Sequence, residues 1–134
     1  KVQNLVSEEY QVLVVDDNAI NRKLAVAMLR AYGFQIQQAS SGREAIDMVK
    51  AQRYHMIFMD HMMPEMDGID TTRNIHALGE KYQKLTIIAL TANVINEAKE
   101  MFLKSGMQDF LAKPIEPKEL DIIISKWLPI AEES

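Results

Sequence analysis

Short apolar runs alternate along the chain with longer segments in which apolar residues recur every three or four positions. Side chains alternate between the two faces of a strand but repeat at about 3.6 residues along a helix, so the short runs predict strands and the longer segments predict helices. The predicted strands are 11–15, 34–39, 56–59, 86–90 and 109–112, and the predicted helices are 18–30, 43–52, 67–78, 96–105 and 117–128.

Capping residues mark several of the predicted helix ends. Asn18 is a residue type preferred at a helix N-terminus, and Gly33 follows the first predicted helix, where glycine commonly ends a helix. Ser41 and Glu44 have the spacing of a capping box, in which the two residues exchange side-chain to main-chain hydrogen bonds. These signals indicate that the helices begin and end close to the predicted positions.

Two of the predicted helices have clear apolar faces. One face of the first helix is formed by Ile20, Leu24, Ala27 and Met28. The face of the last helix that we expect to be buried is formed by Leu120, Ile123, Ile124 and Trp127. Helices of this kind pack over the faces of a parallel sheet when strand and helix alternate. We therefore expect an α/β fold whose most apolar strands, 11–15, 56–59 and 86–90, are central.

The composition narrows the function. The chain has 134 residues, 48% of them hydrophobic, which suits one domain with a sizeable core. It has no cysteine, which excludes disulfides and thiolate metal sites, and its net charge of −4 disfavours direct nucleic-acid binding. No apolar run approaches the length of a membrane span, and the N-terminus lacks the layout of a secretory signal. We expect a soluble, cytoplasmic domain without membrane insertion.

Polar residues stand at the carboxyl ends of four of the five predicted strands. Asp16 and Asp17 follow the first strand, Asp60 the third and Thr91 the fourth, and Lys113 comes shortly after the fifth. These side chains should converge on the edge at which open α/β sheets bind ligands. Neighbouring carboxylates repel one another unless cations join them, and the lysine together with Mg²⁺ could supply that charge. A phosphoryl group would complete such a Mg²⁺ site, so Asp60 is a candidate phosphoryl acceptor.

The ordered motifs "VVDD", "FMDHMMPEMDG", "LTA" and "AKP" resemble those of response-regulator receiver domains, and the resemblance covers Tyr10 to Leu128. It implies a flavodoxin-like (βα)5 doubly wound sandwich, with a five-stranded parallel sheet of order 2-1-3-4-5. It also implies that Asp60 accepts a phosphoryl group from the phosphohistidine of a histidine kinase or a histidine phosphotransfer domain. Such a domain catalyses its own phosphorylation and dephosphorylation.

The resemblance implies a role for each residue around the acceptor. Asp17, Asp60 and the backbone carbonyl of Met62 would bind Mg²⁺ directly, and Asp16 would act mainly through bound water. The apolar side chain of Met62 stands where water access to the acceptor is often controlled, which leaves the dephosphorylation rate open.

A second set of residues matches the positions that respond to phosphorylation in this family. Thr91 would be the switch hydroxyl, and Lys113 would hold the phosphoryl group, with a cis peptide bond before Pro114. Phe110 falls at the aromatic switch position. Because it has no phenolic hydroxyl, we expect its switching to be a change of packing without a hydrogen bond.

Partner surfaces can be assigned on the same resemblance. The region of Ala19, Ile20 and Lys23 on the first helix could dock a four-helix histidine domain for phosphoryl transfer. The conformational change on activation would occur at residues 91–110. The segments "HMMPEMDG" and "SKWLP" resemble receivers attached to hybrid sensor histidine kinases. A parent kinase could tether the domain to the inner membrane, and a weak homodimer is left open.

The domain limits follow from the same comparison. We expect a linker segment at residues 1–9, the receiver at 10–129 and a tail at 130–134. The sequence leaves open whether the chain is part of a hybrid kinase or stands alone.

Two other function classes are left open. An aspartyl-nucleophile phosphatase would also use a strand-end aspartate, but Met62 stands where a second carboxylate would serve as acid and base. A binding module without chemistry, such as a flavodoxin-type cofactor binder or a pseudo-receiver, is the other class. Flavin phosphate would meet the acidic segment "DDNAIN", and no acid, threonine or lysine of the receiver pattern is missing.

The three histidines do not suggest a further site. Alternation along the third strand directs His61 away from Asp60, which favours an exposed side chain. We expect the same of His55 and His76.

Overall fold

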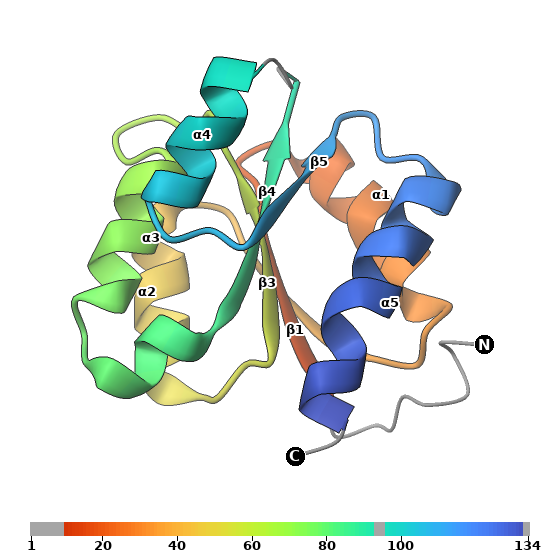
Figure 1. Cartoon of the computed structure of the whole chain (residues 1–134), viewed down its shortest axis with the longest axis horizontal. Helices are drawn as coiled ribbons and strands as arrows, with labels where there is room; N and C mark the ends of the chain where they lie inside the picture. Colours follow the sequence, from red (N-terminus) through yellow and green to blue (C-terminus); the bar gives the residue numbers. More distant parts are fainter. Residues whose placement is uncertain (1–9, 93–95, 133–134) are drawn as a thin grey trace.

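The computed structural model describes residues 10–92 and 96–132 and contains a parallel sheet between two layers of helices (Figure 1). The strands are β1 (Gln11–Val15), β2 (Gln35–Ala39), β3 (Met56–Asp60), β4 (Thr86–Thr91) and β5 (Asp109–Ala112). Their order is β2-β1-β3-β4-β5, and every neighbouring pair is parallel. This is the fold class and strand order that the sequence predicts.

Within the described residues, four α-helices and one short 3-10 helix lie between the strands, and a fifth α-helix follows β5. They are α1 (Ala19–Arg30), α2 (Gly42–Ala51), α3 (Gly68–His76), η2 (Glu80–Lys84), α4 (Asn96–Lys104) and α5 (Pro117–Glu132). Helices α1 and α5 cover one face of the sheet, and α2, α3 and α4 cover the other (Figure 1). The 3-10 helix was not predicted, and α5 continues four residues beyond its predicted end.

The core forms on both faces of the three central strands. Along β1, Val12 and Val14 pack with α1 and α5, while Leu13 and Val15 pack with the other helical layer. Every residue of β3 is buried, because helices cover this strand on both sides. The prediction that the most apolar strands are central is confirmed.

The apolar face predicted for α1 lies mostly outside the core. Ile20 is 70% exposed and Leu24 is 59% exposed. The buried residues of α1 are Ala25, Val26 and Leu29, and Met28 alone of the predicted face is partly buried against the same core. The helix therefore has two apolar stripes, and periodicity alone does not indicate which of them meets the sheet.

The predicted caps are present, with one difference. The Asn18 side chain accepts a hydrogen bond from the main chain of Asn21, and Gly33 adopts a φ of 83°, the left-handed conformation that glycine accepts readily. Ser41 accepts from the Glu44 main chain, but the Glu44 carboxylate accepts from the main chain of Ser40, one residue before the expected partner.

No helix among residues 10–92 and 96–132 is long and apolar enough to cross a membrane. The predicted linker, residues 1–9, lies outside the described residues, as do the last two residues of the predicted tail.

Candidate functional site

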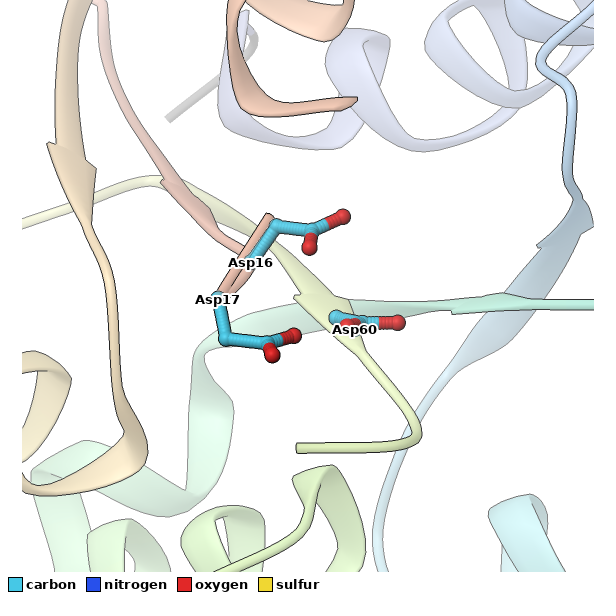
Figure 2. A group of neighbouring side chains, drawn as sticks. All are labelled: Asp16, Asp17 and Asp60. Carbon is cyan, nitrogen blue, oxygen red and sulfur yellow. The ribbon is translucent and has the colours of Figure 1, made fainter. Parts of the chain in front are cut away.

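Three carboxylates meet at the carboxyl edge of the sheet. Asp16 and Asp17 directly follow β1, and Asp60 is the last residue of the adjacent strand β3. Figure 2 shows the three side chains projecting to the same side of this edge. One oxygen from each carboxylate lies within 4.8 Å of the others. Because β1 and β3 are neighbours in the sheet, residues more than forty positions apart in the sequence form one acidic cluster.

Lys113 joins two of these carboxylates. Its Nζ lies 2.8 Å from Asp60 Oδ1 and 3.3 Å from Asp16 Oδ2. Asp16 and Asp60 are only 1% and 3% exposed, whereas Asp17 is exposed. The main-chain N–H of Lys113 donates to the carbonyl of Thr91, which fixes the start of the loop after β5 against the end of β4. The Lys113–Pro114 peptide bond is cis, as predicted.

Burial and the neighbouring opposite charge have opposite effects on the pKa values of Asp60 and Lys113. Burial, together with the neighbouring Asp16 carboxylate, raises the pKa of Asp60 to about 6, although the hydrogen bond from Lys113 works against this rise. Burial also acts to lower the pKa of Lys113, but the carboxylates of Asp60 and Asp16 outweigh it and raise that pKa above its ordinary value. The lysine is therefore held charged, and the Asp60 carboxylate has an unfavourable charged form that a further cation would relieve.

The turn after β3 packs closely against the main chain of Asp60. Asp67 caps α3 by accepting from the Asp70 main chain, and the N–H of Gly68 donates to the carbonyl of His61. A Cβ on Gly68 would lie 2.3 Å from the main-chain oxygen of Asp60, which is far inside van der Waals contact. Only glycine allows α3 to begin so close to the end of β3, so this turn helps to set the position of Asp60.

The main chain after β1 is held from two sides. Asn18 donates its N–H to Asp16 Oδ1 at 2.9 Å, and Arg22 Nη1 donates to the main-chain oxygen of Asp16 at 2.8 Å. Arg22 Nε also donates to Gln38 Oε1 at 3.2 Å, which ties the turn to the region of β2. Sequence reasoning missed Arg22. Its position one turn into the helix that follows two acids is the signal that could have indicated it.

The remaining predicted residues lie at or near the same edge. Thr91 ends β4 and is 1% exposed. Phe110 lies in β5 opposite Ala89 and is half-buried, with Lys99 Nζ 5.2 Å from the centre of its ring. Met62 follows β3, and its side chain is 72% exposed. The structure thus brings Asp16, Asp17, Asp60 and Lys113 together and places the switch candidates on the two strands beside them.

The histidines differ from the prediction that they are exposed. His61 is half-buried, with its ring edge-on to Phe102 and 4.9 Å between the ring centres. His55 is half-buried and stacks on Tyr10. His76 is also half-buried, and a Cβ on Gly106 would lie 2.5 Å from its ring. Neighbours from elsewhere in the fold, Phe102, Tyr10 and Gly106, partly cover these three rings, which sequence position alone does not indicate.

The donor set of the cluster suits Mg²⁺. Three carboxylates and one ammonium leave two negative charges at this edge, which one divalent cation balances. All side-chain donors are carboxylate oxygens, the ligand type that hard cations prefer, and the exposed Asp17 leaves room for the water molecules that Mg²⁺ usually retains.

Comparisons with known proteins agree with this geometry. The family model described as "Response regulator receiver domain" matches residues 12–125. The signal transduction histidine-protein kinase BarA of Escherichia coli K12 is 38% identical over 118 residues, a match that covers 88% of this chain and 13% of BarA. The chain therefore spans about an eighth of the length of this relative.

Two solved structures show the same fold. The receiver domain of the sensor histidine kinase PA1611 of Pseudomonas aeruginosa PAO1, with magnesium in its active-site cleft, matches with a TM-score of 0.81 and 38% identity, covering 90% of this chain and 98% of that one. The complex of the Saccharomyces cerevisiae phosphotransfer protein Ypd1 with the Ssk1 receiver domain gives a TM-score of 0.83 and 30% identity, covering 91% of this chain and 90% of the matched chain.

Proposed function

The chain belongs to the response regulator receiver domain family, and from this premise we propose that Asp60 accepts a phosphoryl group from a phosphohistidine. The observation that carries the proposal is the Lys113 ammonium held between Asp60 and Asp16 beside the exposed carboxylate of Asp17. A phosphoryl group on Asp60 would have its oxygens close to this positive charge, which supports the proposal.

The transfer is a displacement at phosphorus. An oxygen of the Asp60 carboxylate forms the new P–O bond while the P–N bond to the donor imidazole breaks, and the electron pair of that bond stays on the imidazole nitrogen. Asp17, Asp60 and the backbone carbonyl of Met62 would hold Mg²⁺, with Asp16 acting mainly through water. Bound Mg²⁺ would neutralise charge on the transferred group. Lys113 and the Thr91 hydroxyl would bind its remaining oxygens.

The acceptor can be tested without a protein donor. With Mg²⁺ and a small acyl phosphate, the chain should gain one acid-labile phosphoryl group, measured by intact mass. Asp60→Asn should gain none. The matched control is Asp70→Asn, which neutralises an exposed carboxylate in the first turn of α3 and should be phosphorylated like the wild type. Undiminished phosphorylation of Asp60→Asn would exclude the assignment.

Phosphorylation is expected to act through Thr91 and Phe110. The phosphoryl group offers the Thr91 hydroxyl a charge-assisted hydrogen bond, and inward movement of that side chain would vacate space near α4 into which Phe110 could rotate. Rotation would end the contact of the Phe110 ring with the ammonium of Lys99. Amide chemical shifts with and without beryllofluoride, which stands in for the phosphoryl group, test this switch. Silent amides from Thr91 to Phe110 would contradict it.

The exposed apolar face of α1 supports a docking role for a histidine phosphotransfer partner. Ile20 and Leu24 lie on the helix that begins beside the acidic cluster, and both are mostly exposed. Ile20→Asp should slow transfer from a phosphorylated histidine domain but leave the reaction with acyl phosphate unchanged. The control is Leu103→Asp on α4, which is 53% exposed and lies outside the α1 face. Equal transfer rates for both variants would remove the docking assignment.

The wider context is part of the same proposal. We assign residues 10–129 to the receiver, 1–9 to a linker and 130–134 to a tail, within a longer cytoplasmic-facing histidine kinase. The support is the short span of the chain relative to BarA and its likeness to a receiver domain of a sensor histidine kinase. The phosphatase alternative is not favoured, because the exposed Met62 offers no acid or base two residues after Asp60.

A further inference from the structure

The opposite edge of the sheet contains an open pocket that phosphoryl transfer does not use. Its volume is about 780 Å³, and its lining comes from the segment before β3, from the start of β4, from η2 and from Trp127 near the end of α5. These elements lie at the amino ends of the strands, away from the acidic cluster (Figure 1). We call this hollow the amino-edge pocket.

Four cations surround the amino-edge pocket. Lys50, Arg53, Lys81 and Lys84 all contribute to its lining, and the described residues that line it include no aspartate or glutamate. All four side chains are exposed, and none forms an ion pair with an acid in the described part of the chain. In a chain with a net charge of −4, this concentration of unpaired positive charge creates a local field that favours anions.

Aromatic rings supply a second kind of contact in the same pocket. Tyr82 and Trp127 both line it and are half-buried. Lys81 Nζ lies 5.2 Å from the centre of the Tyr82 ring and Lys126 Nζ 5.4 Å from the Trp127 ring, so a base would stack on the opposite ring face or displace these flexible lysines. The Trp127 indole is fixed by a hydrogen bond of 3.0 Å from Nε1 to Asp109 Oδ2, and that carboxylate is already paired with Lys126. Asp109 therefore orients the indole and does not neutralise the cations of the pocket.

His55 adds a directed donor to this lining. Its Nδ1 accepts the main-chain N–H of Gln11 at 3.0 Å, so the proton of the neutral ring is on Nε2. Burial, with the charge of Arg53, lowers the pKa of His55 and keeps the ring neutral at pH 7. A neutral N–H donor beside the cations suits an anionic ligand that also has polar ring atoms.

We propose that the amino-edge pocket binds a nucleoside polyphosphate, with the phosphates among the four cations and the base against Tyr82 and Trp127. The volume lies within the range of about 300–1,000 Å³ that is usual for small-molecule sites. Several clustered cations match the charge of two or three phosphates, and aromatic faces stack on nucleobases. This assignment is independent of the acceptor function at Asp60.

The chain carries its own reporter for this site. Trp127 is its only tryptophan, so its fluorescence can be followed during titration with ATP, adenosine or inorganic triphosphate. EDTA should be present, so that no metal links a phosphate to the acidic cluster. We expect ATP to change the fluorescence saturably and to bind at least about tenfold more tightly than adenosine or triphosphate, because only ATP makes both kinds of contact.

Charge-matched variants locate the binding. Lys81→Gln/Lys84→Gln removes two pocket cations, and should weaken ATP binding about tenfold or more. The control Arg30→Gln/Lys118→Gln removes two exposed cations elsewhere, on α1 and α5, and should change the affinity less than twofold. Circular dichroism checks that both variants are folded.

Three results would overturn the proposal. Equal weakening in the two double variants would indicate attraction by overall charge only. Triphosphate binding as tightly as ATP would indicate a site for polyanions without a place for the base. Amide shifts with ATP that map to the loops of Asp17 and Asp60, with the pocket silent, would place the nucleotide at the acidic cluster. Shifts at Arg53 and Tyr82 that persist in Asp60→Asn would support the amino-edge pocket.

Discussion

The two edges of the sheet carry opposite charge and hold it in different ways. At the carboxyl edge, Asp16 and Asp60 are almost fully buried and share the ammonium of Lys113. At the amino edge, the four cations of the amino-edge pocket are exposed and have no acidic partner among the residues that the structure describes. The difference is one of dielectric environment. Buried charges change each other's pKa and the stability of the fold, whereas exposed charges are screened and remain available to a ligand.

The largest effect should follow from removing the shared cation of the carboxyl edge. Lys113→Met leaves the buried carboxylates of Asp16 and Asp60 without their ammonium, and breaking a buried pair is strongly destabilising. Because the lysine side chain is 22% exposed, we expect a loss of about 3 kcal/mol in the free energy of unfolding, measured by denaturant titration in EDTA. Lys118→Met, at an exposed lysine in the first turn of α5, should change it by less than about 0.5 kcal/mol. Similar losses in both variants would remove the contrast between the edges.

A pH titration sharpens the same contrast. Burial raises the pKa of Asp60 from 3.8 to about 6, so the folded protein keeps a proton there that the unfolded chain releases near pH 4. The contribution of Asp60 to stability is therefore lost as pH rises from about 4 to about 6. Asp60→Asn has no such proton, so its stability relative to the wild type should increase by about 2 kcal/mol between pH 4 and pH 7 in EDTA. If the difference in stability between Asp60→Asn and the wild type does not vary with pH, the pKa of Asp60 is not raised in the folded protein.

The sequence predicts those features of the fold and of the candidate site that follow from the position of a residue within its own strand or helix. Asp16, Asp17, Asp60 and Lys113 were predicted together, because the carboxyl ends of parallel strands meet at one edge and each of these residues stands at or close to a strand end. Helical spacing placed Ile20 and Leu24 on one face of α1 but did not show whether that face meets the sheet, because both stripes of the helix have helical spacing and only the packed sheet distinguishes them.

Other features depend on contacts that have no spacing rule. Arg22 reaches the main chain of Asp16 across a turn, and its second partner, Gln38, lies in β2. The amino-edge pocket is assembled from segments around Arg53, Lys84 and Trp127, which are far apart in the sequence. Such sites can be identified only when the arrangement of the strands is known. Their residues lie at the same edge of the sheet but do not form a sequence motif.

The space available for a Cβ at two glycines shows that the carboxyl edge is packed more tightly than the amino edge. A Cβ on Gly68 would collide with the main chain of Asp60, whereas a Cβ on Gly33, in the loop that leads into β2, would meet nothing within 4 Å. Gly68→Ala should therefore lower the free energy of unfolding by about 2 kcal/mol and slow phosphorylation by acyl phosphate, because the end of β3 at Asp60 must shift. Gly33→Ala carries only the cost of its φ of 83°, about 1 kcal/mol, and should leave the phosphorylation rate unchanged. Equal phosphorylation rates in the two variants would mean that the turn at Gly68 does not set the position of Asp60.

The smallest effect expected is the influence of one edge on the other. Mg²⁺ should stabilise the wild type by about 1–2 kcal/mol at concentrations well above its dissociation constant, since a ligand of the folded state stabilises by mass action. Asp17→Asn should lose most of this gain and, without metal, should be at least as stable as the wild type, because one repelling charge is gone. Lys81→Gln/Lys84→Gln should keep the Mg²⁺ gain to within about 0.3 kcal/mol, because the edges are separated by the length of the strands and exposed charges are screened over about 10 Å at 0.1 M salt. Thermal melts with and without Mg²⁺ at two salt concentrations measure all three proteins. A Mg²⁺ gain that changes in the double variant, and changes more at low salt, would show that the field of the amino edge reaches the metal ligands.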